Sequence, residues 1–116
     1  MINKDHIINR VLKPLCRLDT WSSSHKNCFK CSVGPSETEE HIRAKFERYL
    51  HWRKLGADVF VELRFKDSRP DLVIVKEDGE IVIEEILHSE TTERFNNKLD
   101  RYPFTTTKVL VSEVLK

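Results

Sequence analysis

Residues that break, bend or cross-link a chain are scarce: the 116-residue sequence holds 3 Gly, 4 Pro and 3 Cys. So little glycine and proline excludes a collagen-like or low-complexity chain. Three cysteines cannot all pair with one another, which argues against a secreted disulfide scaffold and favours a reducing, cytoplasmic location. No run of about 18 apolar residues is present to span a membrane, and the start, MINKDHIINR, has no apolar stretch of signal-peptide length. We therefore expect one soluble, folded, intracellular domain with no membrane partner.

A large excess of one charge is also missing, because the net charge is only +1, and this excludes a strongly cationic nucleic-acid coat. The two parts of the chain nevertheless differ. Residues 1–34 carry six Lys or Arg and two Asp, whereas residues 35–116 carry fourteen Lys or Arg and seventeen Asp or Glu. We therefore divide the chain into a basic arm, residues 1–35, and a folded domain, residues 36–116. The arm either lies on a phosphate backbone or is a solvated segment.

Hydrophobic spacing predicts two helical segments in the first half of the chain. Residues 6–18 have apolar side chains at helical intervals, although Pro14 interrupts them. A loop rich in Ser, Asn, Gly and Pro follows over residues 19–35. A long amphipathic helix is then expected, with Ser36 as its N-cap, acidic residues in its first turn and Gly56 at its end.

The second half of the sequence has the pattern of a small sheet. Apolar residues at every second position predict a half-buried strand, a short apolar run predicts a buried one, and Asp78-Gly79 is typical of a hairpin turn. The expected strands cover residues 59–65, 72–75, 81–87 and 108–114, and a helix covers residues 91–102. This order predicts an α/β fold in which a small mixed sheet, a three-strand meander plus one further strand, is flanked by helices.

Acidic residues occur where the hairpin strands meet. Asp71 starts one strand, and Glu84 and Glu85 lie on the next, so tight pairing around Asp78-Gly79 brings them to the same end. Alternation puts Glu84 and Glu85 on opposite faces, and a buried acid is usually hydrogen-bonded, paired or metal-bound. Two carboxylates converging here suit Mg²⁺ or Mn²⁺, which would activate water beside a phosphate. The alternative is a set of acids on a solvated sheet face.

A second polar set lies on the long helix. Glu37, His41 and Lys45 are spaced four residues apart and therefore line one stripe of it. They are either surface ion pairs or the helical side of the metal site. In the second case Glu37 is a third metal ligand, while His41 and Lys45 position the phosphate or the water.

These motifs, in this order, resemble the PD-(D/E)XK nuclease superfamily, and in particular the competence-protein CoiA-like nucleases. Glu37-Thr38-Glu39-Glu40-His41 with Lys45 is similar to the family's helix motif, E-S-x-x-H-x-x-x-K. Arg69-Pro70-Asp71 fits its R-P-D step, and Glu85-Ile86-Leu87-His88-Ser89 fits its strand end, E-x-Q-H-S. The resemblance covers roughly residues 25–102.

The resemblance implies a restriction-endonuclease-like core that hydrolyses DNA phosphodiester bonds with Mg²⁺ or Mn²⁺. Asp71 and Glu85 would hold the metal, with Glu84 as the acid in an alternative register, and Arg69 would contact the nucleic acid. Leu87 stands where the superfamily has the lysine that polarises the attacking water, so the helix lysine would have to supply that charge. DNA, branched or single-stranded, is the expected partner, and cutting both strands would need a homodimer.

The cysteines form a separate motif. A C-x-x-C pair with a nearby histidine and an upstream cysteine suits a tetrahedral Zn²⁺ site, with the ligands Cys16, His25, Cys28 and Cys31. Such a zinc would order a basic segment that has little core of its own, and its Lys26 and Lys30 would contact nucleic acid. The alternative is a set of free thiols in a loop.

These motifs are consistent with three functions. The first is a metal-dependent DNA endonuclease. The second, favoured by Leu87, is a catalytically inactive nucleic-acid-binding module of the same fold. The third is a zinc-stapled protein-interaction domain. Metal-dependent nicking separates the first from the second, and salt-sensitive affinity for nucleic acid separates both from the third.

Overall fold

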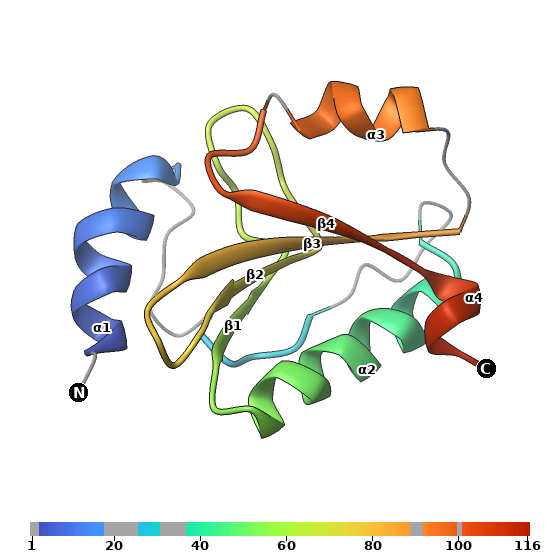
Figure 1. The fold of residues 1–116 in the computed structure, drawn as a ribbon, viewed down its shortest axis with the longest axis horizontal. Helices are drawn as coiled ribbons and strands as arrows, with labels where there is room; N and C mark the ends of the chain where they lie inside the picture. Colours follow the sequence, from blue (N-terminus) through green and yellow to red (C-terminus); the bar gives the residue numbers. More distant parts are fainter. Residues whose placement is uncertain (1–2, 18–25, 31–36, 89–91, 100) are drawn as a thin grey trace.

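A computed structural model describes residues 3–17, 26–30, 37–88, 92–99 and 101–116 of the chain (Figure 1). Its elements in chain order are α1 (Lys4–Ile7), the π-helix η1 (Ile8–Leu12), the 3₁₀-helix η2 (Lys13–Leu15), α2 (Glu39–Lys54), β1 (Asp58–Val61), β2 (Leu72–Val75), β3 (Ile81–Leu87), α3 (Thr92–Leu99), β4 (Thr105–Leu110) and α4 (Val111–Val114). Within these described segments, no helix has the length and apolar character needed to cross a membrane.

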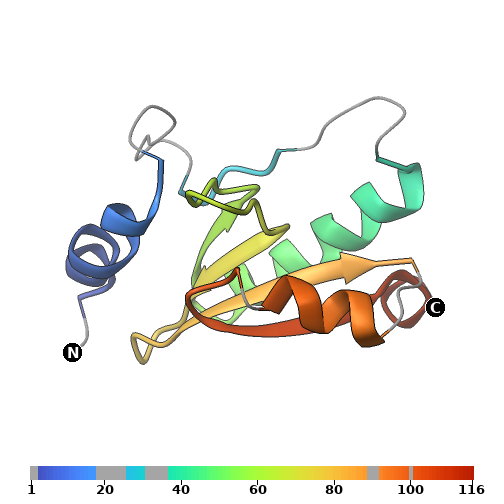
Figure 2. The same ribbon diagram turned by 90° about the horizontal axis from the view of Figure 1, so that it is seen from above.

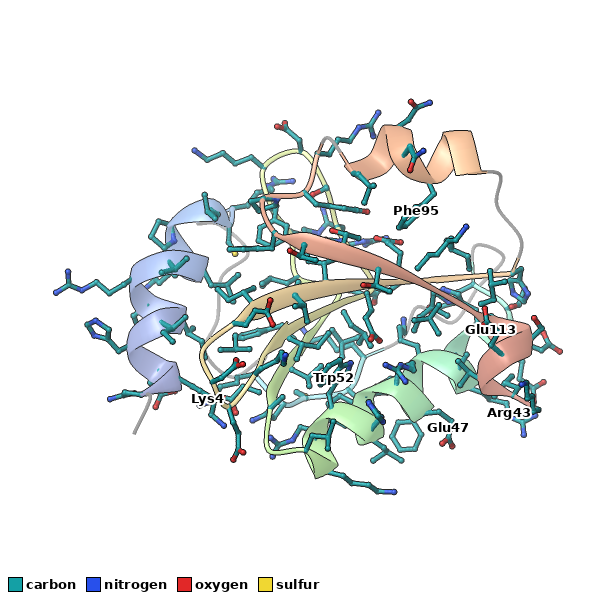
Figure 3. All side chains as sticks on the ribbon, in the orientation of Figure 1. Lys4, Arg43, Glu47, Trp52, Phe95 and Glu113 are labelled. Carbon is teal, nitrogen blue, oxygen red and sulfur yellow. The ribbon has the colours of Figure 1, made fainter. Side chains whose placement is uncertain are left out.

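The four strands form one sheet in the order β1-β2-β3-β4. The first three pair antiparallel as a meander, and β4 returns parallel to β3 after α3. The predicted α/β fold with a mixed sheet flanked by helices is therefore confirmed. Figure 3 shows Phe95 pointing from α3 toward the sheet, whereas Arg43 and Glu47 project from α2 away from it.

Helix α2 begins two residues later than the sequence predicts. Its N-cap is Thr38, whose side-chain oxygen accepts a hydrogen bond from the His41 N–H at 3.1 Å. The predicted cap, Ser36, lies outside the described residues. The predicted end of the helix is confirmed, because Gly56 follows it with a φ of +83°, the left-handed conformation that glycine adopts at low cost.

Two strand predictions need correction. β1 ends at Val61 rather than at residue 65, because Glu62 has a φ of +56° and turns the chain out of the strand. The last strand covers Thr105–Leu110 rather than residues 108–114, and the following residues form α4. The physical reason is that the parallel ladder ends where Leu87, the last residue of β3, pairs with Leu110. Beyond that point the backbone has no strand partner and forms its own helical hydrogen bonds instead.

The alternation of the strands fills two apolar layers, one on each face of the sheet (Figures 1 and 2). The layer toward α2 and α4 consists of Ala44, Ala57, Val59, Val61, Leu72, Ile74, Ile86 and Val111. The layer toward the N-terminal helices consists of Ile8, Leu12, Cys16, Phe60, Leu63, Phe65, Val73, Val75, Ile81 and Ile83. The described start of the chain, residues 3–17, therefore contributes to the core of the domain, with Leu12 fully buried.

Candidate functional site

Five charged side chains meet where the first half of α2 crosses one end of the sheet. We call this set the α2 polar cluster; it consists of Glu37, His41, Lys45, Glu62 and Asp71. Three come from α2 and the residue just before its N-cap, on successive turns. The other two come from the chain that leaves β1 and from the residue before β2. The helical spacing that defined the stripe in the sequence thus aligns it with the ends of two strands.

Lys45 is the buried centre of one half of this cluster. Its side chain has 0% exposure, and its Nζ donates to Glu37 Oε1 at 2.5 Å and lies 3.9 Å from Glu62 Oε1. Its ammonium also lies 5.9 Å from the centre of the Phe29 ring. A buried ammonium is costly unless it is paired, and these two carboxylates compensate its charge. The stripe is therefore an interior network and not a set of surface ion pairs.

His41 links Glu37, the partner of Lys45, to Asp71. Its Nδ1 donates to Glu37 Oε1 at 2.8 Å, and its Nε2 donates to the Ile86 carbonyl at 2.8 Å and lies 3.4 Å from Asp71 Oδ2. Both ring nitrogens therefore face acceptors, which requires a proton on each of them. The contact with Asp71, followed by the interaction with Glu37 and the carbonyl, raises the pKa of His41 to about 9, although burial acts in the opposite direction.

Asp71 closes the ladder between β2 and β3. The last residue pair of that ladder is Leu72 with Glu84. Beyond it, Asp71 Oδ2 accepts the next backbone hydrogen bond, from the Ile86 N–H at 2.8 Å. The same carboxylate oxygen faces His41, so both the N–H and the carbonyl of Ile86 belong to the site. This is the meeting of helix stripe and strand acid that the sequence motifs anticipated.

Glu84 and Glu85 are both buried, with 4% and 6% exposure, and each has a different partner. Glu84 faces α2 and accepts two hydrogen bonds from Arg48, at 2.9 and 2.7 Å. Glu85 faces the opposite side of the sheet and accepts a hydrogen bond from the Tyr102 hydroxyl. The predicted split between the two faces is confirmed. The structure joins Asp71 to the helix residues, whereas it joins Glu85 to Tyr102.

Glu62 is the member of the α2 polar cluster that the sequence analysis missed. The sequence pattern placed it within the predicted half-buried strand of residues 59–65. Instead its backbone has a positive φ, and its N–H donates to the Asp71 carbonyl at 3.0 Å, so the two ends of the β1–β2 connection close on each other. The sequence signal that could have identified it is an acid within the apolar run VFVEL.

The residues predicted to contact nucleic acid lie in different surroundings. Lys26 donates to Asp5 at 2.9 Å, and this hydrogen bond raises its pKa. Lys30 is half-buried, whereas Arg69 is exposed and lies two residues before Asp71. Arg69 is therefore the one of the three that combines exposure with proximity in sequence to the α2 polar cluster.

Of the proposed zinc ligands, His25 and Cys31 lie outside the described residues. Cys16 is buried in the core, and its thiol donates to the Leu12 carbonyl at 3.4 Å. Burial raises the pKa of Cys16 to about 11, which disfavours the thiolate that zinc requires. Cys28 is exposed. Cys16 therefore acts as a core residue in this structure, and zinc binding by the four residues remains a prediction.

The charges of the α2 polar cluster favour a cation. Three carboxylates face two cationic groups, so the cluster is negative even when His41 is protonated. Searching the described residues for a ready metal site, three or more His, Cys, Asp or Glu side chains suitably arranged, finds none. The oxygen atoms around the His41 ring nevertheless include two carboxylates and one backbone carbonyl.

Comparison of the chain with protein families, with curated proteins and with solved structures finds no match. The function must therefore be inferred from the residues of the site and their geometry.

The raised pKa of His41 predicts how stability depends on pH. The pKa in the folded protein lies above the ordinary value of 6.5, so the interaction stabilises the fold fully below about pH 6.5 and is lost as the pH rises through about 9. The loss should be on the order of 3 kcal/mol. Chemical denaturation of wild type and of His41→Gln should show a difference in unfolding free energy that shrinks over this window. A difference that stays constant with pH would contradict the charged imidazole.

Proposed function

We propose that this chain is a metal-dependent nuclease with a restriction-endonuclease-like core. The observation that carries the proposal is the meeting of Asp71, at the start of β2, with Glu37, His41 and Lys45 beside the Ile86 backbone. The element order also agrees with it: a helix, a three-strand meander, a helix, and a strand parallel to the third.

The donor atoms fit a hard divalent cation. Mg²⁺ and Mn²⁺ prefer carboxylate and carbonyl oxygens, and Asp71, Glu37 and the Ile86 carbonyl all contact the same imidazole ring. Asp71 and the Ile86 carbonyl, which both lie at Nε2 of His41, would hold the metal. Glu37 lies at the other ring nitrogen and Glu85 faces the opposite side of the sheet, so the predicted roles of these two acids as metal ligands would need their side chains to move. When bound, such a metal would polarise the phosphate and activate water for attack on phosphorus.

The remaining members of the α2 polar cluster would arrange charge around the scissile phosphate. His41 has 18% side-chain exposure and Lys45 has none, so His41 is the more accessible cation of the cluster. Both of its N–H groups donate within the protein, so its charge would act on a phosphate electrostatically and not through a hydrogen bond. Lys45 lies behind it and balances the acids from inside. The Glu62 carboxylate lies 3.9 Å from the Lys45 ammonium, and the Glu62 N–H donates to the Asp71 carbonyl, so Glu62 helps to position both residues.

The second candidate is a nucleic-acid-binding module that does not cut. Leu87, in the position of the superfamily's lysine, is buried with 9% exposure and offers no charge. Lys45 is already held by two carboxylates, so its charge is partly used within the protein. These two observations favour a site that binds a phosphodiester without polarising the attacking water.

Cleavage of plasmid DNA tests the proposal. Wild-type protein should convert supercoiled plasmid, or branched DNA, to nicked product with Mg²⁺ or Mn²⁺, but not with EDTA. Asp71→Ala, purified in parallel, should not. Metal-dependent nicking of equal rate in both proteins would remove Asp71 from the proposed chemistry, and no nicking by wild type with any metal would favour the binding module.

A further inference from the structure

A second charged feature lies at the tip of the β1–β2 connection, away from the α2 polar cluster. Three chain segments that meet there carry six cationic residues, and we call these residues the basic ridge: Lys13, Arg17, Arg64, Lys66, Arg69 and Arg101. All six are exposed. The three segments are the end of the N-terminal helical stretch, residues 64–69, and the turn before β4.

Contacts around one aromatic side chain hold these three segments together. Phe65 is buried, forms an isolated bridge with Cys16, and its ring lies 6.3 Å from that of Phe104. Backbone contacts reinforce the arrangement, since the Arg17 N–H donates to the Arg64 carbonyl at 3.0 Å. Phe65 thus anchors this loop in the core, while its two neighbours in sequence, Arg64 and Lys66, are exposed.

The turn before β4 is joined to the same loop. The Ser68 hydroxyl donates to the Arg101 carbonyl at 3.5 Å, and the Phe65 N–H donates to the Ser68 carbonyl at 2.8 Å. Tyr102 packs on the same apolar layer as Phe65. In Figure 1 the connection between β1 and β2 lies beside the chain that leads from α3 into β4. Three segments that are far apart in sequence, each with exposed cationic residues, therefore meet at one place.

Cations outnumber acids among the residues of these three segments that the structure describes. In the described residues of the three segments, Asp67 is the one acid against the six cations. Four of the cations, Arg64, Lys66, Arg69 and Arg101, form no ion pair within the described part of the chain. Like charges held close together destabilise a fold unless counter-ions cover them, so the ridge suits a polyanion.

Part of the basic ridge lies between two members of the α2 polar cluster in the sequence. Glu62 and Asp71, the two ends of the connection, belong to the cluster, while Arg64, Lys66 and Arg69 lie between them. Asp71 is five positions after Lys66 in the sequence, which limits their Cα distance to roughly 17 Å. Along a DNA duplex this length is covered by about five base pairs, at 3.4 Å each. One strand can therefore reach both places.

We propose that the basic ridge binds the phosphodiester backbone of DNA and places it across the α2 polar cluster. The choice of DNA rests on the proposed nuclease function, whereas the binding surface itself follows from the ridge. The contacts are with phosphates, so they position the strand without selecting its sequence.

Binding measured without chemistry tests this inference. The triple variant Arg64→Gln/Lys66→Gln/Arg101→Gln leaves Asp71 and its neighbours unchanged. A matched control removes three exposed cations elsewhere: Arg43→Gln/Lys54→Gln/Lys116→Gln. Fluorescence anisotropy with a short labelled duplex in EDTA, at about 50 to 200 mM salt, gives Kd and its salt dependence. Thermal denaturation shows whether both variants are folded.

The ridge variant should bind at least about tenfold more weakly, and its plot of log K against log salt should be less steep by about 2–3. The control should bind as wild type does. Equal losses in both variants, or no loss in the ridge variant, would overturn the inference, as would the absence of salt-dependent binding by wild type. A ridge-dependent affinity without cleavage would reject the proposed nuclease function and leave the binding surface standing.

Discussion

Replacing Lys45 with methionine is expected to lower the free energy of unfolding by about 3–5 kcal/mol. The methionine side chain fills a similar volume, so the loss is electrostatic: Glu37, with 6% side-chain exposure, and Glu62 lose the ammonium that compensates them. Domains of this size have total stabilities of about 5–15 kcal/mol. The melting temperature should therefore fall by more than about 10 °C, which calorimetry measures directly.

Two further variants make the Lys45 prediction specific. Lys54→Met removes an exposed lysine from the same helix and should change stability by less than about 0.5 kcal/mol. In Glu37→Gln/Lys45→Met the buried charge and its main partner disappear together, while Gln still accepts the hydrogen bond from His41. This double variant should recover most of the lost stability, because a neutral pair needs no compensation. A double variant as unstable as the single one would show that packing and not charge holds Lys45 in place.

Asp71→Asn is expected to lower the rate of metal-dependent DNA cleavage by a factor on the order of 10² to 10³. The asparagine oxygen can still accept the hydrogen bond from the Ile86 N–H, so the end of the ladder between β2 and β3 should persist. What disappears is one negative charge beside the Ile86 carbonyl, and a divalent cation needs that charge. Single-turnover cleavage with saturating protein measures the effect.

Asp67→Asn is the matched control for Asp71→Asn. It removes the same charge from the same connection, but at an exposed position near the loop tip. Its cleavage rate should equal that of wild type, and both variants should bind DNA in EDTA at least as tightly as wild type, because each loses a negative charge. Equal cleavage by Asp71→Asn and wild type would remove Asp71 from the proposed chemistry.

Local sequence rules predicted the central hairpin and the helix stripe. The apolar runs of β2 and β3 around Asp78-Gly79 specify a tight antiparallel pair, and the structure has these strands at the predicted residues. The four-residue spacing of Glu37, His41 and Lys45 specifies one helix face whatever the rest of the chain does. These features depend on residues close together in sequence, which is why pattern alone was sufficient for them.

The partner of each acid depended on contacts between distant segments. Alternation requires Glu84 and Glu85 to face opposite sides, but it does not say that α2 supplies Arg48 to one and that Tyr102 approaches the other. The true end of the last strand likewise depended on where β3 ends, since a strand without a partner gains no ladder bonds. Sequence patterns within one segment contain no information about such neighbours.

By itself, the sequence determined the residues of the two hairpin strands, the shared helix face of Glu37, His41 and Lys45, and the acid just before β2. It left open the pairing register of the hairpin and whether that helix face is buried. Only the tertiary structure decided that Lys45 is buried between Glu37 and Glu62, that His41 bridges to Asp71, and that Arg64 and Arg101 belong to one basic ridge. The physical reason is the distance along the chain over which each kind of interaction acts. Helical and strand periodicity act over a few residues, whereas the burial and pairing of a charge are set by whatever chain packs against it, here from segments up to tens of residues away.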